Sequence, residues 1–240
     1  MKRARWAAMR IAVLASLPLL AAASTPDDSR RYMVTGFDRV RIDGPFEVEI
    51  VTGSNGASAE GAPAALDRLV VRVQGNTLVV NSGAIGWERR TGDVPQATKV
   101  RIAAPLLRGI SARGGAQVRV AQMRAARVDV ALEGTGSLDV AEIRADEFSA
   151  WHNGMGALML AGTAVRARVN GAVAGTTDAR GFIADDASLM WDSSGALTIG
   201  VRYTAQISAR GLGPVTVLGK PFCTIRGTAP VTCEGKVERR

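Results

Sequence analysis

Glycine-containing turns recur at a nearly constant interval through the second half of this chain. The turns read GTG, NGMG, NGAVAG, SSG and GLG. Their last glycines follow one another at intervals of 20, 19, 20 and 18 residues: Gly136, Gly156, Gly175, Gly195 and Gly213. A period near 20 residues, running from about Gly114 to Gly219, indicates a solenoid in which each repeat stacks on its neighbour.

A short alternating run follows each turn glycine. Its second and fourth positions are mostly apolar, and residues two apart in a strand point to the same side. We therefore expect two columns of inward-facing side chains: Leu138/Val140, Leu158/Leu160, Thr177/Ala179, Leu197/Ile199 and Val215/Val217. The residue between the two columns is mostly polar and is expected to face outward. Later in two of the repeats we expect a second inward set: Ile143, Ala145 and Phe148, then Val165, Ala167 and Val169.

The length of the repeat favours strands over helices. About 20 residues cannot hold two helices of useful length and their turns, but they can hold two or three short strands. Glycine suits the corners because it takes φ > 0 without strain. The prediction is an all-β fold: a right-handed, single-stranded parallel β-helix or β-solenoid with coils of about 20 residues, its handedness following the general preference of β crossovers. The alternative is a glycine-rich β-sandwich whose turn spacing is accidental.

The first 23 residues have the composition of a secretory signal peptide. Four basic residues surround and precede the start of an apolar stretch at 11–20, and the small residues 21–23 suit cleavage before Ser24. The apolar stretch is too short to span a bilayer and is interrupted by Pro18. We therefore expect an exported protein, periplasmic, at the cell surface or secreted, with no transmembrane span after cleavage.

Removing that segment changes the meaning of the net charge. The chain has 30 Lys and Arg against 22 Asp and Glu, a formal charge of +8, and four of the basic residues lie in the signal, so +4 remains. No block of basic residues interleaved with aromatics is left, which argues against nucleic-acid binding. The scattered arginines are interpreted as a solvated face, and a stripe for acidic glycans or anionic lipid headgroups is the alternative.

The rest of the chain reads as one continuous domain. Residues 24–35 are interpreted as a polar leader, 36–113 as an N-terminal β cap with the first coils, and 114–235 as the repeats. The first part is expected to contain one helical turn started by Pro63 and a hairpin that turns at 75–76. A cap is expected because an open solenoid end exposes unpaired strand edges.

The two cysteines are Cys223 and Cys233. In an exported protein an even count predicts a disulfide, which would hold the last coil against fraying. No cofactor is predicted. No metal site is predicted either, because the glycine-rich nonapeptide calcium pattern is absent and the lone histidine is distant from the cysteines.

Three segments resemble a known family. They are the opening FDRVRIDGPFEVEIVTG with the later LDRLVVRVQGNTLVVN, the repeated glycine turns, and the closing VTVLGKPFCTIRGTAPV. Together they resemble the putative auto-transporter adhesin, head GIN domain family of bacterial exported proteins, over roughly residues 36–235, within a domain drawn as 36–240. The turns GTG, NGMG, SSG and GLG depart from the serial Ser-Gly-Ser-Gly turns of that family, which removes support for turn hydroxyls as ligands. The resemblance implies a β-helix-like extracytoplasmic domain without an established active site.

The leading functional hypothesis is a non-catalytic binding, adhesin-like or envelope structural module. A rigid rod with repeated flat faces suits an extended partner. The candidates are an envelope polysaccharide or another envelope protein, and the sequence identifies neither. Exposed aromatic rings would mark a sugar-stacking surface. The candidates are Trp87 in a loop at 82–97, with Trp151 and Trp191 at similar positions two repeats apart; the favoured alternative is that they are buried as large corner fillers.

The second hypothesis is a polysaccharide hydrolase or lyase that uses carboxylates on a solenoid face. Such enzymes need two carboxylates about 5–10 Å apart. Asp139 and Asp178 lie in the outward column two coils apart, with Met159 between them, so they are expected roughly 10 Å apart. Asp185, Asp186 and Asp192 are weaker candidates, and all five are expected to be solvated carboxylates.

His152 is the only histidine of the chain. It stands just before a turn and is expected to be a surface side chain. No Gly-x-Ser-x-Gly nucleophile elbow occurs in the sequence, so nothing points to a catalytic triad around this histidine. We therefore predict no catalytic residue.

Overall fold

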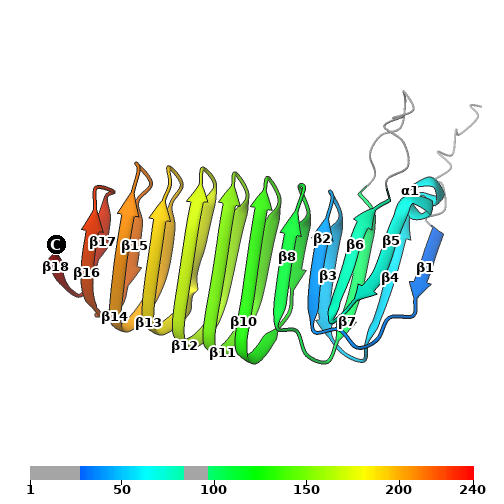
Figure 1. Cartoon of the computed structure of the whole chain (residues 1–240), viewed down its shortest axis with the longest axis horizontal. Helices are drawn as coiled ribbons and strands as arrows, with labels where there is room; N and C mark the ends of the chain where they lie inside the picture. The colour runs from blue at the N-terminus through cyan, green and yellow to red at the C-terminus, as the bar shows by residue number, and fades with distance from the viewer. Residues whose placement is uncertain (1–27, 84–96) are drawn as a thin grey trace, which may run out of the picture.

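The computed structural model of the protein describes residues 28–83 and 97–240. The described chain is almost entirely β-structure, wound into coils that stack side by side along one long axis (Figure 1). The strands of the repeats pair in parallel with an offset of about 20 residues between partners, as in Val128 opposite Phe148. The prediction of an all-β solenoid with coils of this length is confirmed.

The N-terminal part contains nine short strands and one helix. They are β1 (Asp28–Tyr32), β2 (Arg39–Asp43), β3 (Glu47–Thr52), β4 (Gly56–Gly61), α1 (Pro63–Arg68), β5 (Leu69–Gln74), β6 (Thr77–Ser82), β7 (Lys99–Ala104), β8 (Gly109–Arg113) and β9 (Gln117–Val120). The repeats are longer strands: β10 (Met123–Gly134), β11 (Ser137–Gly154), β12 (Ala157–Val173), β13 (Thr176–Asp192) and β14 (Leu197–Arg210). The chain closes with β15 (Val215–Leu218), β16 (Phe222–Gly227), β17 (Val231–Cys233) and β18 (Lys236–Arg239).

The first coils are not stacked in chain order. The coil formed by β2 and β3 pairs with β6 and β7 on one side and with β8 and β9 on the other. The strand β8 then pairs with β10, and β9 with β11. The first coil is therefore enclosed by two later ones, and strands far apart in sequence become neighbours on one face.

Antiparallel strands close the N-terminal end of the solenoid. The strand β4 pairs antiparallel with β1 and β7, and β5 forms an antiparallel hairpin with β6. Helix α1 lies at this same end, opposite the C-terminus (Figure 1). It begins at Pro63 and buries Leu66. Residues 24–35 were interpreted from the sequence as a polar leader, and the strand β1 occupies residues 28–32 of that segment.

The predicted inward columns of the repeats form the core. All ten side chains, from Leu138/Val140 to Val215/Val217, are at most 3% exposed. Later in the coil, Ile143, Phe148, Ala167 and Val169 are also buried, and Ala145 is half-buried. The prediction was wrong for Val165, which is 43% exposed, because alternation breaks there: Val165 and Arg166 both face outward, between the inward-facing Ala164 and Ala167.

The strands of the repeats run around their corners without ending. The strand β11 spans 18 residues, nearly a whole coil, and it ends at the glycine turn that precedes β12. At the bend after the inward pair, β11 places two residues opposite one residue of β12, between Val140 and Ile143. The sequence predicted two or three separate short strands at this place.

The turn glycines are required for a different reason from the one the sequence suggested. None of Gly136, Gly156, Gly175, Gly195 and Gly213 has a positive φ; Gly134, Gly154 and Gly211 at the start of the turns have it instead. A Cβ atom on any of the first five would overlap a backbone carbonyl of the turn in the preceding coil. Close stacking of turn upon turn, rather than a left-handed conformation, therefore fixes these positions.

The predicted disulfide is present. Cys223 in β16 and Cys233 in β17 are joined by an S–S bond, and Cys223 is fully buried. Among the strands of the described residues, β17 and β18 each pair with one, β15 and β16 respectively. The disulfide thus ties the last, one-sided coil to the body of the solenoid.

Candidate functional site

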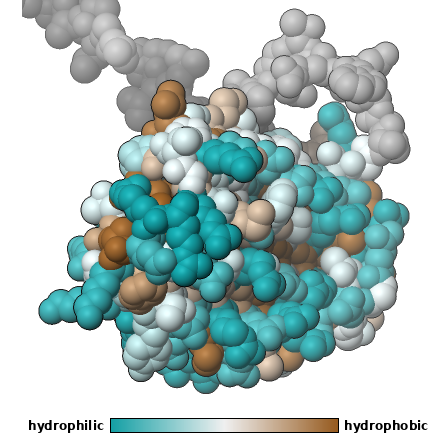
Figure 2. Space-filling model, turned by 60° about the vertical axis from the view of Figure 1, so that its left-hand side comes forward, coloured by the Kyte–Doolittle hydropathy of each residue, from teal (hydrophilic) through white to brown (hydrophobic). Residues whose placement is uncertain are grey.

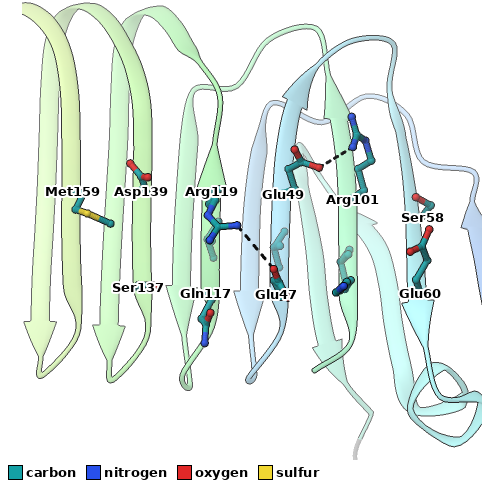
Figure 3. A pocket seen from close by; sticks show the side chains of 14 residues that line it. Glu47, Glu49, Ser58, Glu60, Arg101, Gln117, Arg119, Ser137, Asp139 and Met159 are labelled. Carbon is teal, nitrogen blue, oxygen red and sulfur yellow. Dashed lines mark hydrogen bonds and ion pairs between the residues drawn. The ribbon is translucent and has the colours of Figure 1, made fainter. Parts of the chain in front are cut away.

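The principal candidate site is a groove of about 420 Å³ on one face of the solenoid. We call it the charged groove. It crosses six strands, and the outward-facing side chains of these strands line it: Glu47, Glu49, Ser58, Glu60, Lys99, Arg101, Gln117, Arg119, Ser137, Asp139 and Met159. Figure 3 shows these side chains side by side on β4, β7, β3, β9, β11 and β12.

Charges of opposite sign alternate along one row of the charged groove. Reading across the strands, Arg101 lies opposite Glu49, Glu49 opposite Arg119, and Arg119 opposite Asp139. Arg101 donates a hydrogen bond of 2.8 Å to Glu49, and Arg119 approaches Glu47 at 3.9 Å (Figure 3). Cross-strand neighbours of opposite charge stabilise a sheet modestly, so this pattern also stabilises the pairing of these strands.

Three charged side chains of the charged groove have no ion pair within the described part of the chain: Glu60, Lys99 and Asp139. They stand toward the two ends of the groove, Glu60 and Lys99 beside β4 and Asp139 beside Met159. An unpaired charge on a rigid strand is a ready contact for a partner, because no internal ion pair has to be broken. The arrangement therefore suits polar recognition along an extended line.

The sequence did not predict the charged groove. Its signal was present, since Glu47/Glu49, Lys99/Arg101 and Gln117/Arg119 are polar pairs at alternate positions within apolar strands. What the sequence lacked was the order of the coils, because β3 lies between β7 and β9 only in the folded chain.

The tryptophans proposed as a sugar-stacking surface fall into three different situations. Trp151 is 48% exposed and lies on an outward row of β11. Trp191 is 1% exposed, so its proposed role at the surface was wrong. Trp87 lies outside the described residues.

Trp191 is buried because it lies one residue after the position in β13 that is equivalent to Trp151. The residue equivalent to Trp151 two coils later is Met190, by way of Asn170. Trp191 therefore faces inward and lies against Gly171, where any Cβ atom would overlap its ring. Its indole Nε1 donates a 2.9 Å hydrogen bond to the carbonyl of Gly195, so the polar atom of the buried ring is satisfied.

The carboxylates of the hydrolase hypothesis are not gathered into one site. Asp139 and Asp178 flank Met159 in one row, as expected. Asp178 pairs with Arg180 at 3.2 Å. Asp185 pairs with Arg202 at 3.0 Å, and Asp186 accepts a hydrogen bond from the Thr204 hydroxyl. Asp192 is exposed. In the described residues no hydrogen bond joins two of these carboxyl groups.

Two glutamates on the outer surface are held in the ionised form. Hydrogen bonds from Arg127 and Arg166 lower the pKa of Glu147. A hydrogen bond from Gln122, reinforced by Arg144 and Arg124, lowers the pKa of Glu142. A general acid in glycoside hydrolysis needs a raised pKa, so neither glutamate is suited to that role.

His152 is buried in the core, and the expectation of a surface side chain was wrong. Its Nδ1 shares a hydrogen bond of 2.8 Å with the hydroxyl of Thr177, another inward residue. Burial lowers the pKa of His152 to about 4. The ring is enclosed by core side chains, so it has no route to an external substrate and does not form a catalytic triad.

Figure 2 shows the molecule with its C-terminal end turned forward. In this view the surface is mostly hydrophilic, and the hydrophobic residues on it form separate patches. No helix among the described residues is long and apolar enough to cross a bilayer. In residues 28–83 and 97–240, no cluster of His, Cys, Asp and Glu side chains is arranged to hold a metal ion.

A stacked parallel solenoid with a flat, polar and charged face defines a class of extended β-proteins that present surfaces rather than deep clefts. Within that class, the chain belongs to the putative auto-transporter adhesin, head GIN domain family, whose family model matches residues 36–221. The resemblance predicted from the sequence is confirmed.

Solved structures share this fold. A putative adhesin from Bacteroides fragilis NCTC 9343 is 20% identical with a TM-score of 0.75, and the match covers 90% of this chain and 98% of that one. A putative adhesin from Parabacteroides distasonis ATCC 8503 is 12% identical with a TM-score of 0.61, over 90% and 97% of the two chains. A putative lipid binding protein from the same organism is 16% identical with a TM-score of 0.54, over 89% and 96%. Among curated proteins no sequence matches.

Proposed function

We propose that this protein is a non-catalytic, extracytoplasmic binding module of the adhesin type, which holds an extended envelope partner along its strand faces. The observation that carries the proposal is the charged groove. Seven charged side chains project there from neighbouring strands of one sheet, on alternate positions fixed by the fold. The partner is an envelope polysaccharide or another envelope protein.

The rigidity of the charged groove supports binding. Its side chains stand on strands that pair on both sides within the coil stack, so their spacing does not have to be created when a partner arrives. Arg101 is further oriented by Glu49, which it contacts at 2.8 Å. Arginines that are held in place lose less conformational freedom on binding, which favours affinity.

Several observations favour binding over hydrolysis. Asp178 and Asp185 have arginine partners, Asp186 has a hydroxyl partner, and the single histidine is enclosed in the core. Asp139 and Asp178, the two carboxylates that share a row, stand two coils apart with Met159 between their side chains. The hydrolase or lyase alternative therefore has no observation in its favour.

The family and the first residues of the chain support a location outside the cytoplasm. The family description names adhesins of the auto-transporter type, and residues 1–23 read as a signal peptide. Those residues lie outside the described part of the chain. One structural relative is called a lipid binding protein, so lipid vesicles belong in the test.

The test is a binding assay of the purified protein on isolated envelope polysaccharides, envelope proteins and lipid vesicles, with every bound sample also analysed for cleavage products. We expect binding without cleavage, weakened about tenfold or more by Arg119→Ala combined with Lys99→Ala, as for hot-spot residues of an interface. Arg144→Ala, an exposed arginine that is paired with Glu142 outside the charged groove, is the matched control. Cleavage of a bound polymer, lost in Asp178→Asn, would instead establish an enzyme.

A further inference from the structure

A second outward face of the solenoid carries two adjacent rows of mostly polar side chains across five consecutive coils. The first row is Ser149, Arg168, Ser188, Gln206 and Thr224, and the second is Trp151, Asn170, Met190, Ser208 and Arg226. We call these ten residues the two-row face. They lie on β11, β12, β13, β14 and β16, and two grooves of about 430 and 370 Å³ run along them.

The composition of the two-row face differs sharply from that of the charged groove. Its ten residues include two arginines and no carboxylate, whereas the charged groove alternates both signs. The first row continues into a carboxylate on each flanking strand, and both have arginine partners: Asp129 beside Ser149 pairs with Arg39, and Glu238 beside Thr224 pairs with Arg240. Neither Arg168 nor Arg226 makes an ion pair with any described residue. Of the neighbouring acidic side chains, Glu147 pairs with Arg127 and Arg166, whereas Asp186 accepts a hydrogen bond from the neutral Thr204 hydroxyl and keeps its charge. The two free guanidinium groups are therefore available to an anionic ligand.

The uncharged members of the two-row face are suited to a ligand rich in hydroxyl groups. Six of the ten residues are serine, threonine, asparagine or glutamine, which both donate and accept hydrogen bonds. Trp151 stands diagonally from Arg168, two residues along and one strand across, so their Cα atoms are about 8 Å apart. An exposed indole beside a free guanidinium offers a flat stacking surface next to an anion-binding group.

We infer that the two-row face binds an acidic polysaccharide, a polymer of uronic acid or similarly anionic sugars. Its sugar rings stack on Trp151, and its carboxylates pair with Arg168 and Arg226. Its hydroxyl groups form hydrogen bonds with the serine and glutamine side chains of the two rows. Five strands spaced about 4.8 Å apart span roughly 19 Å, enough for several sugar units in line. This inference rests on the proposed binding function and adds a ligand class and a second face to it.

Other anionic partners fit the two-row face less well. Nucleic acid binds through many phosphate contacts, and this face has only two unpaired arginines. A membrane surface requires a broad apolar face, and Trp151 and Met190 are the only large apolar residues among the ten.

The experiment measures the affinity of the purified protein for polygalacturonate, for neutral dextran and for phosphatidylglycerol vesicles. We expect binding to polygalacturonate that weakens with salt, and no binding to dextran. Arg168→Ala and Trp151→Ala should each reduce the affinity about tenfold, and Arg168→Lys should restore part of it. Arg144→Ala, an exposed arginine elsewhere on the surface, should leave the affinity unchanged.

Three results would overturn the inference: equal binding to dextran, affinity unaffected by Arg168→Ala and Trp151→Ala, or binding to the vesicles alone. A correctly folded variant is recognised by an unchanged circular dichroism spectrum and melting temperature. If polygalacturonate fails to bind while another envelope partner binds and is lost in Arg119→Ala with Lys99→Ala, only this inference fails. The proposed function fails when no envelope component binds to either face, or when a bound polymer is cleaved.

Discussion

The imidazole Nδ1 of His152 and the hydroxyl Oγ1 of Thr177 lie 2.8 Å apart inside the solenoid, although 25 residues separate them in the chain. His152 is fully buried, and Thr177 is 2% exposed. The coil between them contributes Gly171 at the position next to His152, and this residue has no side chain to fill the interior. The ring of Trp191 occupies the space on the other side of Gly171. A polar pair thus replaces an apolar contact within an otherwise hydrophobic column.

Replacing Thr177 with valine should destabilise the protein. The substitution keeps the size of the side chain but removes the hydrogen bond, and the Nε2 of His152 is already buried without a described partner. Leaving the imidazole wholly unsatisfied costs about 1–3 kcal/mol. Urea unfolding should show this loss for Thr177→Val, whereas the outward-facing Thr198→Val should change the free energy of unfolding by less than about 0.5 kcal/mol. Equal effects of the two variants would contradict the importance of the pair.

The burial of His152 should make stability depend on pH. Burial lowers its pKa to about 4 from an ordinary value of 6.5. Between these two values the unfolded chain binds a proton that the folded chain does not, so the free energy of unfolding should fall as the pH decreases from about 6.5 to 4. The contribution is fully present above pH 6.5 and is bounded by about 1.4 kcal/mol per unit of pKa difference.

Because His152 is the only histidine, its NMR ring resonances report this pKa directly. Urea midpoints at several pH values, compared between the protein and His152→Gln, isolate its contribution because the carboxylates are common to both. A titration midpoint near 6.5 would show that the ring is not buried in solution. A stability difference independent of pH would contradict the linkage.

Much of the core of the repeats could be predicted from the sequence because the inward-facing residues stand at fixed distances after each turn glycine. A glycine turn sets the starting point, and alternation then places Leu138 and Val140 inward. The prediction became unreliable after the first bend of the coil. Further along β12, Val165 and Arg166 are both exposed between the buried Ala164 and Ala167, so alternation counted back from Ala167 placed Val165 inward by mistake.

A shift of one residue also explains why Trp151 is exposed and Trp191 is buried. Met190 is the residue equivalent to Trp151 two coils later. Trp191 is one residue further along and lies on the opposite side of the strand. A change of one position reverses the face of every side chain in a strand. The approximate period read from the sequence could not resolve such a shift, since successive turns differ by 18 to 20 residues.

The charged groove lay beyond sequence reasoning for a different reason. Its central strand β3 is paired with β7 and β9, so Glu47 meets Lys99 and Gln117, which are 52 and 70 residues away. The regular period does not extend into residues 36–113. No local pattern specified which of these coils would be neighbours, although the polar positions themselves were visible.

Substitution of a turn glycine should be severe even though its φ is ordinary. A Cβ atom at position 175 would overlap the carbonyl of Gly156 in the preceding turn. We expect Gly175→Ala to separate the two turns and to lower the free energy of unfolding by about 1–3 kcal/mol, as in overpacked sites. The control is Gly56→Ala, where the nearest atom to a Cβ is 3.9 Å away. Thermal unfolding should distinguish them, and a neutral Gly175→Ala would show that the turns are not closely stacked.

Removal of the disulfide should loosen one end of the solenoid rather than the whole. Cys223 and Cys233 close a short loop with a sequence separation of 10, for which the chain-entropy account gives about 3 kcal/mol. Within residues 28–83 and 97–240, the affected strands β17 and β18 have a partner on one side only, so they have little other support. In the variant with Cys223→Ser and Cys233→Ser, hydrogen exchange should therefore accelerate in β16 to β18 and stay unchanged in β10 to β13. Limited proteolysis should likewise cut the variant first near residue 220. Uniform acceleration across all coils would mean instead that the solenoid unfolds as one cooperative unit, with the disulfide stabilising every coil equally.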